Sequence, residues 1–167
     1  MNGAIDLLRN VLKTWRRVPE QVTIQQQDVT VIAYAAGRDT SGNYTLVEVV
    51  LGRYAVGPPL HHHAGTTEAL YVLEGSLVCT LDRRTVMMTP GHALLIHPDM
   101  IHTCFNPTAA LARVLVLRRP CPIDQQRTAL AVLTALAWQT IVRDPVLQAQ
   151  LTQQYDQHLS PQDQGVA

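Results

Sequence analysis

Three histidines and one glutamate in the 167-residue sequence have side chains and spacings that suit metal binding. His61 and His63 are two positions apart, so in an extended strand their side chains point to the same side. Glu68 follows five residues after His63, and His102 lies in a separate segment. If the strands close into a barrel, His102 completes a set of three nitrogens and one oxygen from an adjacent strand. Such a set leaves open positions on an octahedral ion, as substrate or oxygen activation requires.

We expect one divalent metal ion held by His61, His63, Glu68 and His102, in preference to a degenerate barrel whose histidines only form hydrogen bonds. Imidazole and carboxylate donors suit iron, manganese, nickel, copper or zinc, and the sequence does not choose among them. Glu68 is the one candidate catalytic residue, because its carboxylate can stay a ligand or double as a base.

The other histidines between residues 61 and 102 are expected to be structural. His62 should point away from the barrel interior, as a surface histidine, and His92 follows the turn at Pro90-Gly91. For His97, packing in a turn is favoured over lining the barrel mouth. Cys104, two residues after His102, can share its inward face. We interpret it as a small apolar filler in preference to a soft ligand or redox group, because free cysteines are usually buried and inert. Arg53 is interpreted as a surface residue in preference to an anion-binding one.

Short β-rich runs separated by Gly, Pro and Asp turns position these residues. The predicted strands are 29–36, 44–54, 68–74, 76–81, 84–88, 92–96 and 112–117. Many short strands at close spacing indicate an antiparallel sandwich or barrel. The alternation places Leu70, Val72, Leu94 and Ile96 in the core, which would make a pocket largely apolar.

The ends of the chain have a helical pattern. We expect an N-terminal helix at 1–20, a barrel at 21–120, a C-terminal helical hairpin at 121–160 and a flexible tail at 161–167. The stripe of the last helix is Leu147, Leu151, Tyr155 and Leu159. The C-terminal helices can cover the barrel or build a homodimer interface, and a homodimer is expected because symmetric dimers are the commonest oligomers.

Charge and composition exclude several classes of partner. The sequence has 13 basic and 13 acidic residues, so it lacks the basic excess that an extended grip on nucleic acid or anionic lipid needs. It shows no signal peptide, and its most apolar run is too short to span a membrane. Three unpatterned cysteines do not indicate a disulfide framework. We expect a cytoplasmic protein whose partner is a small molecule, with no nucleic acid and no membrane.

Two segments resemble the paired motifs of the cupin superfamily. In the first motif, His61, His63, Glu68 and Gly75 have the required spacing, although Ala55 stands where the motif begins with glycine and Gly57 follows two residues later. In the second motif, Gly91, His102 and Asn106 fit, whereas His97 and Asp99 replace its proline and second glycine. The spacer between the motifs is residues 76–90, as short as in compact microbial cupins.

The resemblance implies a double-stranded β-helix barrel of the cupin or jelly-roll type. It also implies that His61, His63, Glu68 and His102 are the ligands of one divalent ion. The departures at Ala55, His97 and Asp99 affect turns rather than ligands. The stretch 57–75 is also similar to single-domain cupins related to quercetin dioxygenases.

The leading hypothesis is a metal-dependent enzyme, dioxygenase-like, that acts on a small aromatic or enolic substrate. An isomerase or decarboxylase on the same metal shell is an alternative. A non-catalytic small-molecule-binding or sensor cupin is a hypothesis of a different class. Direct DNA contact by the C-terminal helices is disfavoured, because residues 124–160 contain only Arg127 and Arg143 as fixed positive charges.

Overall fold

The computed structural model describes residues 20–24, 28–120, 146, 149 and 158–159, most of which lie in two antiparallel sheets. The strands are β1 (Glu20–Ile24), β2 (Val29–Ala35), β3 (Thr45–Leu51), β4 (His61–His62), β5 (Thr67–Glu74), β6 (Leu77–Leu81), β7 (Arg84–Met88), β8 (Ala93–Ile96), β9 (His102–Phe105), β10 (Ala112–Arg119) and β11 (His158–Leu159). A 3-10 turn at Gly37–Thr40 joins β2 to β3. The predicted mainly β fold is confirmed.

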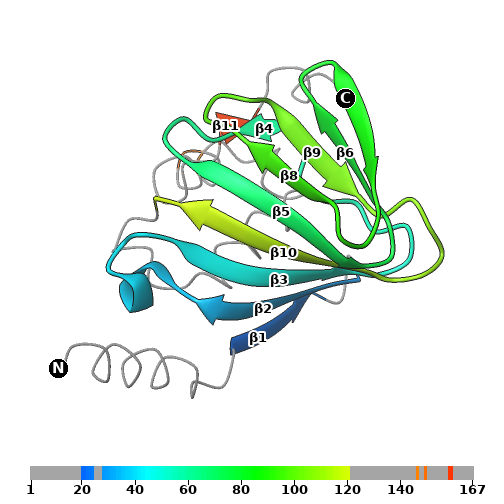
Figure 1. Cartoon of the computed structure of the whole chain (residues 1–167), viewed down its shortest axis with the longest axis horizontal. Helices are drawn as coiled ribbons and strands as arrows, with labels where there is room; N and C mark the ends of the chain where they lie inside the picture. Colours follow the sequence, from blue (N-terminus) through cyan, green and yellow to red (C-terminus); the bar gives the residue numbers. More distant parts are fainter. Residues whose placement is uncertain (1–19, 25–27, 121–145, 147–148, 150–157, 160–167) are drawn as a thin grey trace, which may run out of the picture.

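The two sheets are built from segments that alternate along the chain. One sheet has the order β1-β2-β3-β10-β5-β8, and the other has the order β11-β4-β9-β6-β7. Figure 1 shows the strands of the first sheet side by side from β8 to β1. Neighbours such as β3 and β10 are distant in sequence, so the architecture rests on long-range pairing.

The core lies between the sheets, where inward-facing residues of both meet. On β10, Ala112, Val114 and Val116 alternate with less buried neighbours, as the period of two in a strand requires. They pack in one cluster with residues of the other sheet such as Leu77 and Met88. The predicted core residues Leu70, Val72 and Ile96 are fully buried, and Leu94 packs against the cluster.

Glu48 breaks this alternation, because it is 1% exposed between the buried Val47 and the inward-facing Val49. Its carboxylate accepts hydrogen bonds from Arg113 Nε at 2.6 Å and from the Tyr34 hydroxyl at 2.7 Å. Burial alone would raise the pKa of Glu48, but the bonds from Arg113 and Tyr34 outweigh it and lower that pKa. A buried carboxylate is thus kept ionised by its partners.

Two departures from the cupin motifs have local backbone explanations. Asp99, where the motif has glycine, has φ +64°, a left-handed conformation that aspartate tolerates better than most residues. Its amide donates to the carbonyl oxygen of His63 at 2.9 Å. Gly57 donates to the Cys104 carbonyl, and a Cβ at residue 57 would collide with that oxygen. The close approach that needs glycine is therefore at 57, and Ala55 is accommodated in the core.

Several sequence predictions concern residues outside the described part of the chain. The proposed helix at 1–20 and most of the hairpin at 121–160 belong to this group. Within the described part, β1 pairs with β2, and the sequence analysis predicted no strand there. His158 and Leu159, the latter expected at the end of a helical stripe, pair instead with β4. No helix among the described residues is long and apolar enough to cross a membrane.

Asn106 ties the loop after β9 to the end of β3. Its side-chain amide donates to the carbonyl oxygens of Leu51, Gly52 and Ala110, and its Oδ1 accepts from the backbone and hydroxyl of Thr108. The residue is 1% exposed, so water cannot replace these bonds.

We expect Asn106→Ala to lower the free energy of unfolding by about 2–4 kcal/mol, because it leaves buried carbonyls unpaired. Urea denaturation followed by circular dichroism measures the loss. Asn43→Ala is the matched control, since Asn43 is exposed and its side chain bonds only Thr40 among the described residues. Equal losses in the two variants would contradict the role given to Asn106.

Candidate metal centre

Two cross-strand pairs, one from each sheet, build the site. His61 on β4 is the direct partner of His102 on β9. Glu68 on β5 is the direct partner of Arg118 on β10. His63 follows β4, with its carbonyl held by the amide of Asp99. The predicted set His61, His63, Glu68 and His102 is thus brought together, and Arg118 joins it.

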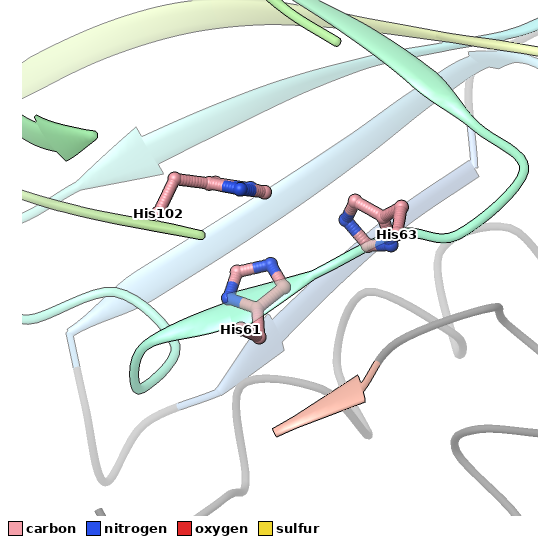
Figure 2. A group of neighbouring side chains, drawn as sticks. All are labelled: His61, His63 and His102. Atoms are coloured by element: carbon pink, nitrogen blue, oxygen red, sulfur yellow. The ribbon is translucent and has the colours of Figure 1, made fainter. Parts of the chain in front are cut away.

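The three imidazoles form a compact, buried cluster. Their candidate ligand nitrogens all lie within 4.8 Å of one another, and each histidine is at most 4% exposed. Figure 2 shows the rings of His61, His63 and His102 converging on one region. The ring centroids are 4.2 Å apart for His61 and His102 and 5.0 Å apart for His61 and His63. Three buried histidines in this arrangement could hold a metal ion.

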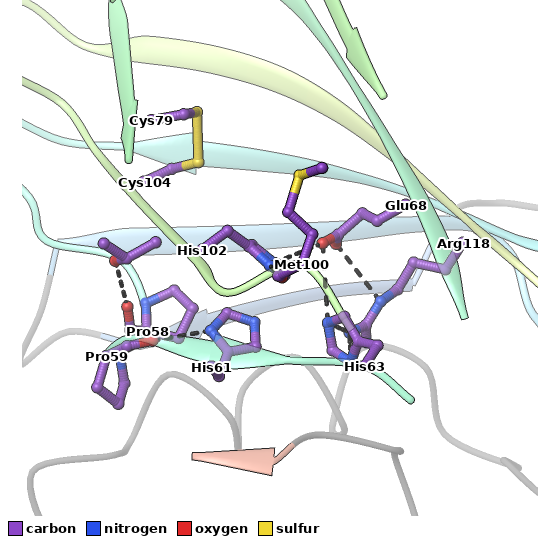
Figure 3. Close-up of polar contacts among 11 residues, drawn as sticks. Pro58, Pro59, His61, His63, Glu68, Cys79, Met100, His102, Cys104 and Arg118 are labelled. Carbon is purple, nitrogen blue, oxygen red and sulfur yellow. Dashed lines mark hydrogen bonds and ion pairs between the residues drawn. A yellow bond between two sulfur atoms is a disulfide. The ribbon is translucent and has the colours of Figure 1, made fainter. Parts of the chain in front are cut away.

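Backbone carbonyls fix the orientation of two of these rings. Nδ1 of His61 lies 2.8 Å from the Pro59 carbonyl oxygen, and Nδ1 of His102 lies 2.9 Å from that of Met100 (Figure 3). A carbonyl only accepts, so in each ring Nδ1 carries the proton and donates it. In the neutral rings Nε2 then keeps its lone pair, which is the arrangement that metal-binding histidines commonly use.

Glu68 faces the histidine cluster and places a carboxylate oxygen beside the imidazole nitrogens. Its Oε2 is 3.2 Å from Nε2 of His102 and 3.8 Å from Nε2 of His63. A carboxylate oxygen and an imidazole lone pair at 3.2 Å repel each other unless a proton or a cation lies between them. The three imidazoles could hold a divalent ion, and Glu68 places a carboxylate oxygen beside them.

Arg118 is the second charged residue of the site. Its Nε lies 3.4 Å from Oε1 of Glu68, and its Nη2 contacts both ring nitrogens of His63, 2.9 Å from Nδ1. Burial by itself would raise the pKa of Glu68, but the charge of Arg118 and the contact with His102 hold that pKa well below its usual range. Glu68 is thus a charged carboxylate at neutral pH.

Burial in the site keeps His61 neutral. Burial lowers its pKa well below the ordinary value for histidine, and the nearby His102 and His63 lower it further. A neutral imidazole is the form that binds a metal ion, so no proton has to be displaced from His61 near neutral pH.

An apolar cavity opens onto the cluster. Its internal volume is about 110 Å³. The charged residues that line it, within the described part of the chain, are Glu68 and Arg118. Its other lining residues include Val47, Val49, Leu51, Leu70, Val114 and Val116. The cavity suits a small organic molecule with one polar end beside the histidines.

The remaining candidates lie away from the centre. His92 and His97 are exposed, and Arg53 is at the surface, as expected from the sequence. Sequence analysis missed Arg118, although a signal was present. Arg118 continues the alternating inward row of β10 after Val116, so the period of two places it in the interior.

The interpretation of Cys104 as a free apolar filler was wrong. Cys104 forms a disulfide with Cys79, its direct partner across β6 and β9 (Figure 3). The bond links the strand that carries His102 to its neighbour, and Cys104 lines the cavity. The two cysteines are 25 residues apart, so only the strand register reveals their pairing.

A family model described as a cupin domain matches residues 48–118. A comparison with curated proteins finds no match. Among solved structures, KdgF from a Halomonas species is 20% identical with a TM-score of 0.53, covering 63% of this chain and 89% of its own. An RmlC-like cupin from Shewanella frigidimarina NCIMB 400 is 17% identical with a TM-score of 0.53, covering 64% and 87%.

A third solved structure, the nucleoside dehydratase Pac13 from Streptomyces, is 15% identical with a TM-score of 0.51, covering 65% of this chain and 81% of its own.

The described part of the chain has two antiparallel sheets and three buried histidines that could hold a metal ion. The family match and these structures make the assignment specific: residues 48–118 match a cupin domain, and the solved structures share its fold. The expected homodimer and cytoplasmic location stay predictions.

We expect His61→Ala and His102→Ala each to lower the affinity for a divalent ion by at least about tenfold, because each removes one nitrogen donor. Elemental analysis after metal loading and dialysis measures the bound ion per chain. His97→Ala, which changes an exposed histidine, is the matched control and should keep the wild-type content. Unchanged metal content in both cluster variants would contradict the assignment of these ligands.

The lowered pKa of His61 predicts a pH dependence of stability. With a chelator present, the unfolded chain protonates this residue more readily than the folded chain, so stability falls as pH falls from about 7 to about 5. One such group contributes at most about 1.4 kcal/mol per pH unit. Thermal unfolding across this range should therefore show a smaller decline for His61→Asn than for wild type. His97→Asn is the control, and equal declines in wild type and His61→Asn would contradict the prediction.

Proposed function

We propose that this protein is a metal-dependent enzyme that acts on a small organic molecule bound in the apolar cavity. The observation that carries the proposal is that His61, His102 and Glu68 line that cavity, with His63 beside them. His61, His63, His102 and Glu68 would hold one divalent ion. The ion, when bound, would polarise a substrate oxygen as a Lewis acid.

The chain's own residues set the geometry of the reaction. The carbonyls of Pro59 and Met100 hold two imidazoles in fixed orientations, which positions their Nε2 atoms without reorganisation. The valine and leucine walls exclude water and contact the apolar part of a substrate.

Glu68 has properties that favour a ligand role over a base role. A carboxylate whose pKa lies well below the usual range is a weak proton acceptor near neutral pH. It instead supplies a fixed negative charge that stabilises a cation at the cluster. We therefore assign Glu68 to ion binding and expect substrate deprotonation, where it occurs, to depend on the ion.

Oxygen-dependent cleavage of an aromatic or enolic substrate is the first reaction to test. We expect protein loaded with Fe(II), Mn(II), Ni(II), Cu(II) or Zn(II) to consume oxygen with at least one flavonol, diketone or aromatic carboxylic acid, followed with an oxygen electrode. His61→Ala should lose this activity, and His97→Ala should retain it.

The same mixtures incubated without oxygen, followed by NMR, separate the remaining reactions. Metal-dependent conversion without oxygen uptake would replace the dioxygenase by an isomerase or decarboxylase. Tight binding with no conversion under either condition would contradict an enzyme and favour a sensor.

A further inference from the structure

Arg118 lines the cavity and is not a surface residue. It is on the inward row of β10, and its side chain is 17% exposed. Its Nε is buried and makes no hydrogen bond within the part of the chain that the structure describes, and the nearest carboxylate oxygen is Glu68 Oε1 at 3.4 Å. Figure 3 shows its guanidinium extending from β10 to the edge of the His63 ring.

The guanidinium and a metal ion require the same electron pair. A neutral imidazole has one nitrogen lone pair, and both the Nη2 of Arg118 and a bound ion need that of His63. The positive charge of Arg118 also repels a cation at the cluster. An ion that binds His63 therefore displaces the guanidinium from the ring, and its N–H groups then need another acceptor.

The net charge of the cavity indicates that the new hydrogen-bond acceptor for Arg118 is an anion. Glu68 and Arg118 balance each other, and they are the charged residues that line the cavity within the described chain. A divalent ion would leave two uncompensated positive charges beside apolar walls, and charges in such surroundings are stabilised only when they are paired. A carboxylate that contacts both the ion and Arg118 compensates one of these two charges and accepts hydrogen bonds from the guanidinium.

We infer that Arg118 is the substrate-anchoring residue of the metal centre and that the substrate is a small carboxylic acid with an apolar body. This inference rests on the proposed function, because the carboxylate is shared between Arg118 and the bound ion. Two parallel guanidinium N–H groups match the two oxygens of a carboxylate. The body of the molecule then lies against the valines and leucines of β3 and β10.

Benzoate and benzamide are the probes, because they share one shape and differ in charge. Each is titrated into Co(II)-loaded full-length protein, and binding is measured by calorimetry and by the visible absorption of Co(II). We expect wild type to bind benzoate at least about tenfold more tightly than benzamide, a difference typical of a charged pair in an apolar cavity. Arg118→Met should lose most of this preference and keep only the part that the ion alone supplies, and Arg118→Lys should restore part of the loss.

Co(II) affinity is the second readout, and it does not depend on any activity. Arg118→Met should bind Co(II) more tightly than wild type, because it removes a competitor for His63 and a repelling charge. Arg119→Met is the matched control, since Arg119 is the next residue of β10, carries the same charge and is exposed. It should behave as wild type, and circular dichroism checks that each variant is folded.

The outcomes separate the two proposals. A wild-type chain that takes up no Co(II) overturns the proposed function and this inference with it. Co(II) uptake without a preference for benzoate, or with a preference that is undiminished in Arg118→Met, overturns the inference alone. Loss of the preference in Arg119→Met as well as in Arg118→Met also overturns it, because general charge would then explain the binding.

Discussion

The register of two antiparallel pairings determines the chemistry of this barrel. On one sheet β4 and β9 place His61 opposite His102, and on the other β5 and β10 place Glu68 opposite Arg118. A shift of either pairing by one residue would turn a side chain of the site to the other face of its sheet. The turn at Asp99, which holds the His63 carbonyl, and Asn106, which ties two loops, both support this register.

Charge balance is the second constraint, and it follows from the first. The paired Glu68 and Arg118 are neutral as a set in a cavity whose remaining walls are largely apolar. The imidazoles add lone pairs but no charge when they are neutral, and burial keeps His61 in that form. Any added cation changes this balance, which couples ion binding to the position of Arg118 and to the charge of the ligand.

Local patterns made much of the barrel predictable from sequence. The strand expected at 84–88 is observed at the same residues, because turn residues bound it on both sides. The alternation of β5 and β8 correctly placed Leu70, Val72 and Ile96 in the core. His61 and His63 were expected on one side of a strand, and both are buried.

Non-local features were missed for a physical reason. The Cys79–Cys104 disulfide depends on the pairing of β6 with β9, which no local pattern encodes. Glu48 is buried because Tyr34 and Arg113 reach it from neighbouring strands. Arg118 is a different case, since its strand alternation was available and only its charge argued for the surface.

The most direct test of the account is the position of a metal ion in crystals of the zinc-loaded protein, located by anomalous scattering. The account predicts one strong peak about 2.0–2.2 Å from the imidazole nitrogens of His61, His63 and His102 and from a Glu68 oxygen. It also predicts that the Arg118 guanidinium no longer contacts the ring nitrogens of His63. A peak at another position, or no peak in protein that has been saturated with zinc, would contradict the account.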